Sequence, residues 1–242
     1  TSITGLACLL AVALTACAGG GEPPAPSGSP ASAPLEALKE PANSMSVSPP
    51  LSPAPVSAEA LAAYRALLAG EPGALDRPPE GLELHQVTLP PAEELEYVLL
   101  DLDGDGGAEL VVQMVAQPHQ FNAVFHYGDG ELSCWQYDIM EMSCRDYPLG
   151  DGAMVRQYDT GTGPNRYSNL YTVFRYLPDG ETEECASLAV HQDTQEDGTE
   201  VFTYLVDDAE VDQDTFAAEF EELVGSRLLS LEDWTPATER PG

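Results

Sequence analysis

Apolar and polar residues alternate with a period of two along much of the chain between residues 82 and 206, which is the spacing of half-buried β-strands. Turn dipeptides punctuate the alternation at Asp129-Gly130, Asp179-Gly180 and Asp197-Gly198. Such regular punctuation is typical of an antiparallel meander. The pattern predicts strands at 82–89, 96–100, 109–116, 123–127, 132–137, 154–158, 170–176, 185–192 and 200–206.

Two segments show helical spacing instead. In the first, Leu61, Tyr64 and Leu68 share one face, between a capping Ser57 and a terminating Gly70. The second, TFAAEFEELVGSRLL, follows a cap at Asp212 or Asp214 and has the apolar face Phe216, Phe220, Leu223 and Val224. The predicted fold class is therefore α+β, an antiparallel β-meander sheet with an N-terminal and a C-terminal helix packed on it. A mainly β sandwich is the alternative.

Four carboxylates interrupt the strand pattern between the apolar runs YVLL and LVVQMV: Asp101, Asp103, Asp105 and Glu109. Like charges this close cannot all stay ionised without a positive partner, except at a high cost in free energy. No Lys or Arg lies between residues 77 and 145. A bound cation would supply the missing positive charge.

The spacing of these acids is that of a calcium loop, in which ligands at positions 1, 3, 5, 7 and 9 converge on one ion and Gly at position 6 allows the turn. These ligands are Asp101, Asp103, Asp105, the carbonyl of Gly107, and Glu109. Position 12 is Val112 and the flanks predict strands, so this is no helix-loop-helix site. The segment resembles the DxDGDGxxDL loops of integrin-type FG-GAP and related EF-hand-like extracellular repeats. The resemblance implies one bound Ca²⁺; an acidic turn that binds nothing is the alternative.

The N-terminal segment ITGLACLLAVALTA is too short to span a bilayer, which takes about 20 apolar residues, and has the length of a signal-peptide apolar region. Its last three residues and the following Cys17 form LTAC, which resembles the bacterial lipobox. The resemblance implies cleavage before Cys17 and a lipid on its thiol. Residues 1–16 are therefore predicted to be a signal peptide that lacks its true start. An ordinary secretory signal is the alternative.

Pro, Ser, Ala and Gly dominate residues 17–56, which predicts a disordered tether after the lipidated Cys17. The globular domain is expected at 57–234 and a disordered tail at 235–242. This layout, with one LDLDGDGGAEL loop and the hairpins FHYGDGEL and VFRYLPDGETEE, resembles uncharacterised surface lipoproteins of anaerobic Gram-positive gut bacteria. The resemblance implies a location on the outer face of the cell membrane, held there by the lipid on Cys17.

The chain has 41 acidic residues against nine Lys and Arg, and a formal net charge of −32. This composition excludes nucleic acid as a partner, because nucleic-acid binding needs a basic surface. Self-repulsion of this size costs stability, which divalent cations would relieve. Plain solubility is the alternative explanation for the charge.

Cys134, Cys144 and Cys185 lie in the predicted domain, and an odd number leaves at least one thiol outside an intramolecular pair. Cys134 and Cys144 are spaced to pair across a hairpin, and the sequence leaves that pairing open. No CxxC motif is present, so neither a zinc nor a redox site is predicted.

No catalytic motif is present: the chain lacks HExxH, GxSxG and SxxK. The sequence therefore predicts a non-catalytic surface protein with one structural Ca²⁺ and leaves a glycan, peptide or protein ligand open. One alternative is a carbohydrate- or peptide-binding module, which would show an exposed aromatic row on one sheet face. The other is a hydrolase, which would need a pocket with two carboxylates, or His119 or His126 beside a carboxylate.

Overall fold

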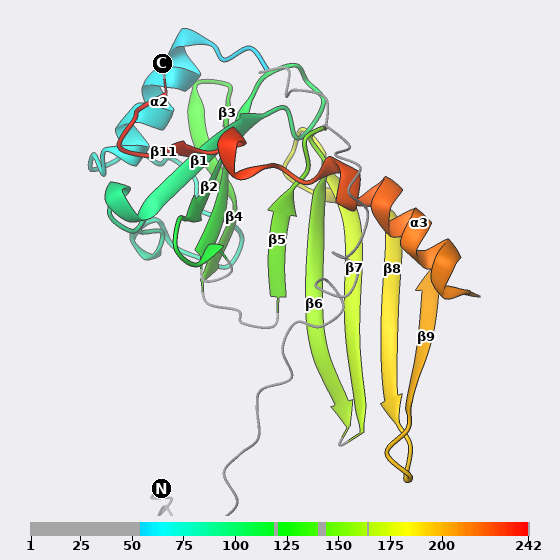
Figure 1. Ribbon diagram of the computed structural model, residues 1–242. Helices are drawn as coiled ribbons and strands as arrows, with labels where there is room; N and C mark the ends of the chain where they lie inside the picture. The colour runs from blue at the N-terminus through cyan, green and yellow to red at the C-terminus, as the bar shows by residue number, and fades with distance from the viewer. Residues whose placement is uncertain (1–53, 119–120, 140–143, 164, 242) are drawn as a thin grey trace, which may run out of the picture. The chain divides into compact units, whose positions relative to one another are not determined.

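The computed structural model of the protein describes residues 54–118, 121–139, 144–163 and 165–241 (Figure 1). All of them belong to one structural unit, which spans Ser44–Gly242. The predicted signal segment, Cys17 and nearly all of the predicted tether lie outside the described residues. Within the described ranges, no helix has both the length and the apolar character needed to cross a membrane.

Helix α2 (Ala58–Leu68) begins where its sequence predicts. The Ser57 hydroxyl accepts a hydrogen bond from the Ala60 N–H at 3.0 Å, which satisfies one of the donors left open at a helix start. Gly70 follows the helix with φ +68°, a left-handed conformation that glycine adopts without strain. Tyr64 and Leu68 are buried, so α2 presents an apolar face to the protein interior.

The first half of the meander forms a five-stranded sheet in which all neighbours are antiparallel. Its strands, in spatial order, are β11 (Thr235–Pro236), β1 (Leu95–Leu100), β2 (Glu109–Met114), β3 (Phe121–Gly128) and β4 (Glu131–Ile139). One face of this sheet packs against α2, where Tyr64 and Leu67 share a core with Leu110 and Phe125 (Figure 1).

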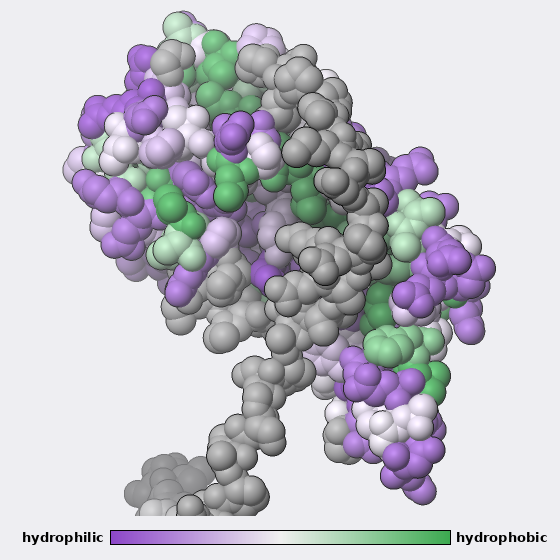
Figure 2. All heavy atoms as spheres, in the orientation of Figure 1, coloured by the Kyte–Doolittle hydropathy of each residue, from purple (hydrophilic) through white to green (hydrophobic). Residues whose placement is uncertain are grey.

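The second half forms a six-stranded antiparallel sheet. Its strands, in spatial order, are β10 (Ala209–Val211), β9 (Glu200–Val206), β8 (Thr182–Thr194), β7 (Arg166–Tyr176), β6 (Met154–Gly163) and β5 (Cys144–Pro148). Helix α3 (Gln213–Leu223) packs on it through Phe216 and Phe220, whose rings contact Tyr204 and Tyr171. The outer side of α3 is hydrophilic (Figure 2).

The two sheets meet over a second apolar cluster. Val98 and Val111 of the five-stranded sheet pack there with Met154, Phe174 and Tyr176 of the six-stranded sheet. The predicted α+β class, with antiparallel meanders and two flanking helices, is confirmed. The strands belong to two sheets, however, and each sheet has its own helix.

Three predicted elements differ from the structure. Residues 82–89 contain only a short 3₁₀ turn (Leu84–Gln86); none of these residues is fully buried, so a strand there would have no face in the core. The C-terminal helix ends at Leu223, and a separate 3₁₀ turn (Gly225–Arg227) follows. Three short strands, β5, β10 and β11, were not predicted.

The predicted tail is the third difference: residues 235–241 are part of the fold. Strand β11 pairs with the open edge of β1, and the Ala237 N–H donates to the Leu95 carbonyl at 2.9 Å. Pro236 is tolerated because an edge strand does not need every N–H. Arg65 of α2 donates to the Pro241 carbonyl at 2.6 Å, so this segment also contacts the first helix.

Candidate metal centre

The acidic loop joins β1 to β2 and is closed by hydrogen bonds from its own backbone. The Asp101 carboxylate accepts from the N–H groups of Gly104 (2.7 Å) and Gly106 (3.1 Å). The Asp105 carboxylate accepts from the Gly107 N–H at 2.6 Å. Gly106 has φ +89°, in agreement with the sharp turn expected at position 6. The three loop aspartates, Asp101, Asp103 and Asp105, bring a carboxylate oxygen each to within 4.8 Å of one another.

Asp103 is the loop acid that has a buried carboxylate oxygen without a hydrogen-bond partner. Its Oδ1 accepts from the Asp105 N–H at 3.0 Å, but its Oδ2 is buried and has no hydrogen-bond partner. Burial raises the pKa of Asp103; the hydrogen bond from Asp105 opposes this, and the negative charges of Asp105 and Asp101 add to it. A buried carboxylate oxygen without a donor is costly, and a cation would satisfy it.

Glu109, the first residue of β2, is only 1% exposed. Its Oε2 accepts from the Leu102 N–H at 2.7 Å, and its Oε1 lies 3.0 Å from Nδ1 of His126 on β3. Burial raises the pKa of Glu109, and the hydrogen bonds from His126 and Leu102 offset only part of the rise. Burial lowers the pKa of His126, but the hydrogen bond and charge of Glu109, with Asp103 and Asp105, raise it above its usual value.

A bulge in β4 determines how the His126 ring is held. The pairing of β3 with β4 shifts between Val124 and Phe125, which leaves Trp135 as the extra residue on β4. The indole of Trp135 stacks on the His126 imidazole at a centroid distance of 4.3 Å and an interplanar angle of 11°. The imidazole is therefore fixed between an aromatic ring and a buried carboxylate.

Two other parts of the fold contact the loop. The buried hydroxyl of Tyr64, on α2, donates to the Ala108 carbonyl at 2.8 Å. On the other side, Gly152 in the turn between β5 and β6 lies so close to the Asp101 carbonyl that a Cβ at residue 152 would overlap its oxygen. The loop is thus held between the first helix and the six-stranded sheet.

The structure divides the predicted ligands into two groups. Asp101, Asp103 and Asp105 form one group that could hold a metal ion, and Asp103, Glu109 and His126 form a second. Glu109 therefore lies with His126 rather than with all three loop aspartates. The Gly107 carbonyl stays a predicted ligand, and Cys17 lies outside the described residues.

The sequence named His126 only as a possible hydrolase residue beside a carboxylate, and not as a metal ligand. The structure does place it beside a carboxylate: it is seventeen residues beyond Glu109 and reaches it through the β2–β3 pairing. A signal was present: both residues are ionisable groups within strongly apolar strand segments.

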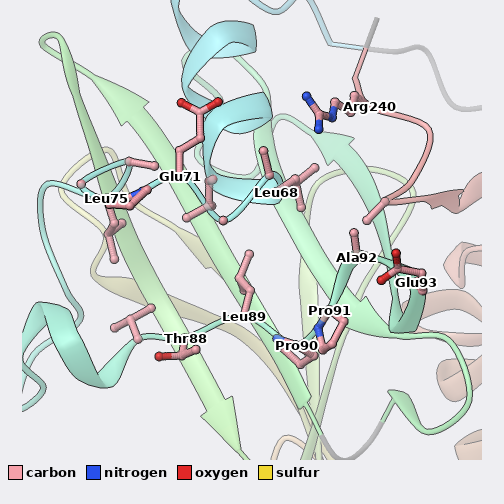
Figure 3. Close-up of a pocket in the computed structure, with 18 of the residues that line it drawn as sticks. Leu68, Glu71, Leu75, Thr88, Leu89, Pro90, Pro91, Ala92, Glu93 and Arg240 are labelled. Carbon is pink, nitrogen blue, oxygen red and sulfur yellow. The ribbon is translucent and has the colours of Figure 1, made fainter.

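A separate pocket of about 840 Å³ lies between the end of α2, residues 84–93 and residues 237–240. Figure 3 shows Leu68 and Leu89 near the middle of the pocket, Leu75 at one side, and Glu93 and Arg240 at the other side. None of the described residues that line it is Phe, Tyr or Trp, so the pocket lacks an aromatic platform for a sugar ring. None of its lining residues belongs to the metal groups.

An exposed aromatic row is not present among the described residues. The exposed aromatic side chains there are Tyr158 and Phe202. Across β6, β7, β8 and β9, Tyr158 is in register with Leu170, Ala189 and Leu205. On β9, Leu205 is an odd number of residues from Phe202, so their side chains point to opposite faces. The two rings therefore lie on opposite faces of the sheet.

The remaining thiols do not add a second site. Cys134 is a free, buried thiol, so the Cys134–Cys144 pairing that the sequence left open is not formed. Burial raises the pKa of Cys134 to about 12. Cys185 is a free, exposed thiol on β8.

No family model matches the chain, and neither a curated protein nor a solved structure matches it.

Proposed function

We propose that the protein is a lipid-anchored, extracytoplasmic protein that binds one structural Ca²⁺ in the loop between β1 and β2 and has a non-catalytic role at the cell surface. The observation that carries the proposal is the buried Oδ2 of Asp103, which has no hydrogen-bond partner and lies in a group with Asp101 and Asp105. A cation bound between these carboxylates would attract all of them and outweigh their mutual repulsion.

The chemistry of the loop favours calcium over other divalent ions. The three aspartates offer only oxygen atoms, and the Gly107 carbonyl would add another. Calcium takes six to eight oxygen ligands in a flexible arrangement, whereas magnesium keeps several waters. In this proposal the ion fastens β1 to β2 and binds only the folded state, so it stabilises the protein through linkage.

The ion test measures the melting temperature of the full chain in calcium-stripped buffer, with Ca²⁺ and with Mg²⁺. Extracellular calcium modules have dissociation constants of about 10⁻⁴ to 10⁻³ M. At one hundred times the dissociation constant, linkage adds about 2.7 kcal/mol, which corresponds to a rise of roughly 5–10 °C for a domain of this size. Mg²⁺ is expected to give a smaller rise.

Asp105→Ala tests the assignment to the loop, and Asp179→Ala is its matched control. Asp105 and Asp179 both accept a backbone hydrogen bond from the residue two positions later, and alanine removes that acceptor from both. Only Asp105→Ala also removes a predicted calcium ligand, so only this variant should abolish the calcium-dependent rise. If wild type shows no rise with calcium, or if both variants keep the full rise, the loop is not a calcium site.

The anchor is tested separately, because it rests on the lipobox resemblance of LTAC and not on the ion. The chain, preceded by a start Met and basic residues that complete the predicted signal peptide, should incorporate labelled palmitate and sediment with membranes when it is expressed in a lipoprotein-processing bacterium. Cys17→Ser should abolish both, and Cys8→Ser should abolish neither. Label that persists in Cys17→Ser would contradict the anchor and leave the ion site unaffected.

A further inference from the structure

We propose that Asp103, Glu109 and His126 form a second metal site, which takes a divalent first-row transition metal such as Zn²⁺ through two carboxylates and one imidazole nitrogen. This site shares Asp103 with the calcium loop but does not depend on calcium binding there.

The imidazole is the feature that separates this site from the calcium loop. Calcium is bound by oxygen atoms, whereas zinc accepts His nitrogen together with Asp or Glu oxygen. Nδ1 of His126 faces the cluster, at 3.0 Å from the Glu109 Oε1. One ligand atom from each of the three residues lies within 4.8 Å of the other two.

The spacing of the donors is compatible with a small ion. Zinc bonds to His nitrogen and carboxylate oxygen are about 2.0–2.2 Å long, so two ligand atoms in a tetrahedral arrangement lie roughly 3.3–3.6 Å apart. The 3.0 Å between His126 and Glu109 is close to that value. Asp103, which lies on a loop, is the residue that can approach to complete the set.

The surroundings hold Glu109 and His126 in place before any ion binds. The Leu102 N–H fixes the Oε2 of Glu109 and leaves Oε1 facing the imidazole. Trp135 stacks on the His126 ring. The Glu109 side chain is 2% exposed and that of His126 is 15% exposed, so little water competes for them. Partners that orient a ligand in this way strengthen metal binding.

A buried Glu109–His126 ion pair is the simpler reading of the same contact. That pair satisfies the contact between Glu109 and His126, but it does not account for Asp103, which brings a ligand atom to within 4.8 Å of both. A metal ion between the three residues accounts for all of them at once. The two readings differ in whether the full chain binds zinc through His126.

Titration of the full chain with ZnCl₂ alone, followed by tryptophan fluorescence and by calorimetry, tests the site. Trp135 is one of only two tryptophans and contacts the ligand His126, so its emission should change as the ion binds. Wild type should bind one zinc ion at this site. His126→Gln, which can still donate a hydrogen bond to Glu109, should weaken that binding about ten-fold or more.

Three controls separate this site from other zinc ligands and from the loop. His85→Gln removes an exposed imidazole, and Cys185→Ser removes an exposed thiol; neither should change the zinc affinity measured through tryptophan emission. Asp101→Asn should lower calcium affinity and leave zinc affinity unchanged. Zinc binding without calcium binding would support the second site while overturning the proposed function.

Two results would overturn the inference. One is equal zinc affinity in wild type and His126→Gln, and the other is an Asp101→Asn variant that loses zinc as completely as His126→Gln does. Should His126→Gln fail to fold, the wild-type imidazole nitrogens can be observed by ¹⁵N NMR. Zinc must then shift Nδ1 of His126; an unchanged resonance at zinc saturation would equally overturn the site.

Discussion

Gly152 occupies a position where no side chain fits. It has φ +82°, and a Cβ there would overlap the Asp101 carbonyl oxygen. Gly130 is a suitable comparison, because it has φ +84° in a similar Asp-Gly turn but nothing within 4 Å of an added Cβ. The two residues therefore separate the cost of backbone conformation from the cost of contact with the loop.

We expect Gly130→Ala to lower the free energy of unfolding by about 1–2 kcal/mol, the cost of a left-handed alanine. Gly152→Ala should cost at least about 1 kcal/mol more, because the loop must move away from the turn. It should also weaken calcium binding, while Gly130→Ala should not. Urea denaturation and calcium titration measure the two effects. Equal losses in both variants would show that the contact with Asp101 is unimportant.

The candidate site shows what a single sequence can reveal about individual residues. The 1-3-5 spacing of the aspartates could be read directly, because all its ligands are local. His126 could not, because its approach to Glu109 depends on the β2–β3 register and its ring position depends on the bulge at Trp135. Neither is encoded in a short motif.

At the scale of secondary-structure elements, a chain of polar contacts crosses from one sheet to the other. Asp146 on β5 is central: its backbone carbonyl accepts from Asn122 on β3, and its carboxylate accepts from Gln136 on β4 and from Arg156 on β6. Tyr176 on β7 donates to Gln136 at 2.7 Å. The chain of contacts thus joins five consecutive strands across the sheet boundary.

Asp146→Asn is expected to lower the free energy of unfolding by about 1–3 kcal/mol. Breaking a buried ion pair usually costs more, but Arg156 is half exposed and water can solvate it after the change. Asp193→Asn is the matched control, because Asp193 pairs with Arg166 at the surface at 3.5 Å. Its cost should be at most about 1 kcal/mol. Urea denaturation would contradict the role of Asp146 if the two variants lost equal stability.

The sequence predicts which segments form helices and most of those that form strands, but not to which sheet each strand belongs. Alternation identified most strands, because each has one face in a core. It could not assign them to sheets, since a strand that extends one sheet and a strand that begins another have the same alternation. Strand β5, CRDYP, was missed because its only fully buried side chains are Asp146 and Pro148, which do not resemble a hydrophobic pattern.

At the scale of the whole molecule, the effect of pH should reveal whether an ion is bound. The folded pKa values of Asp103, Glu109 and His126 are all raised. The folded protein therefore binds more protons than the unfolded chain, so these groups add stability as the pH falls. For His126 this stability is complete below the usual pKa of 6.5 and is lost as the pH rises through the folded value.

We therefore expect the melting temperature to change in opposite directions with and without calcium between pH 7.5 and pH 5. In calcium-stripped buffer, the melting temperature should rise as the pH falls. With saturating calcium it should fall, because protons displace the ion from carboxylates that must be ionised to bind it. Differential scanning calorimetry measures both series, and the same trend in both would contradict an ion at the loop.

Below about pH 4, the two series should fall together because of Asp151. Burial acts to raise the pKa of this carboxyl, but hydrogen bonds and charges from Arg227 and Arg175 lower it below 3.8. A lowered folded pKa gives stability that is present above the unfolded value and lost as the pH falls through the folded value. Asp151→Asn should reduce this common decline; Asp197 and Asp212, whose pKa values are also lowered by backbone hydrogen bonds, account for the rest.

The pairing of β11 with β1 has a consequence for the order in which the protein can fold. The residues that complete the edge of the five-stranded sheet, 235–237, come more than 130 positions after β1, and Pro241 contacts α2 at the start of the domain. While the chain is being synthesised, β1 to β4 can associate early, but the β1 edge keeps unpaired backbone groups until residues 235–237 emerge. A nascent chain therefore presents an open strand edge throughout the synthesis of the residues between β1 and β11, and this edge is where premature association with other chains would begin.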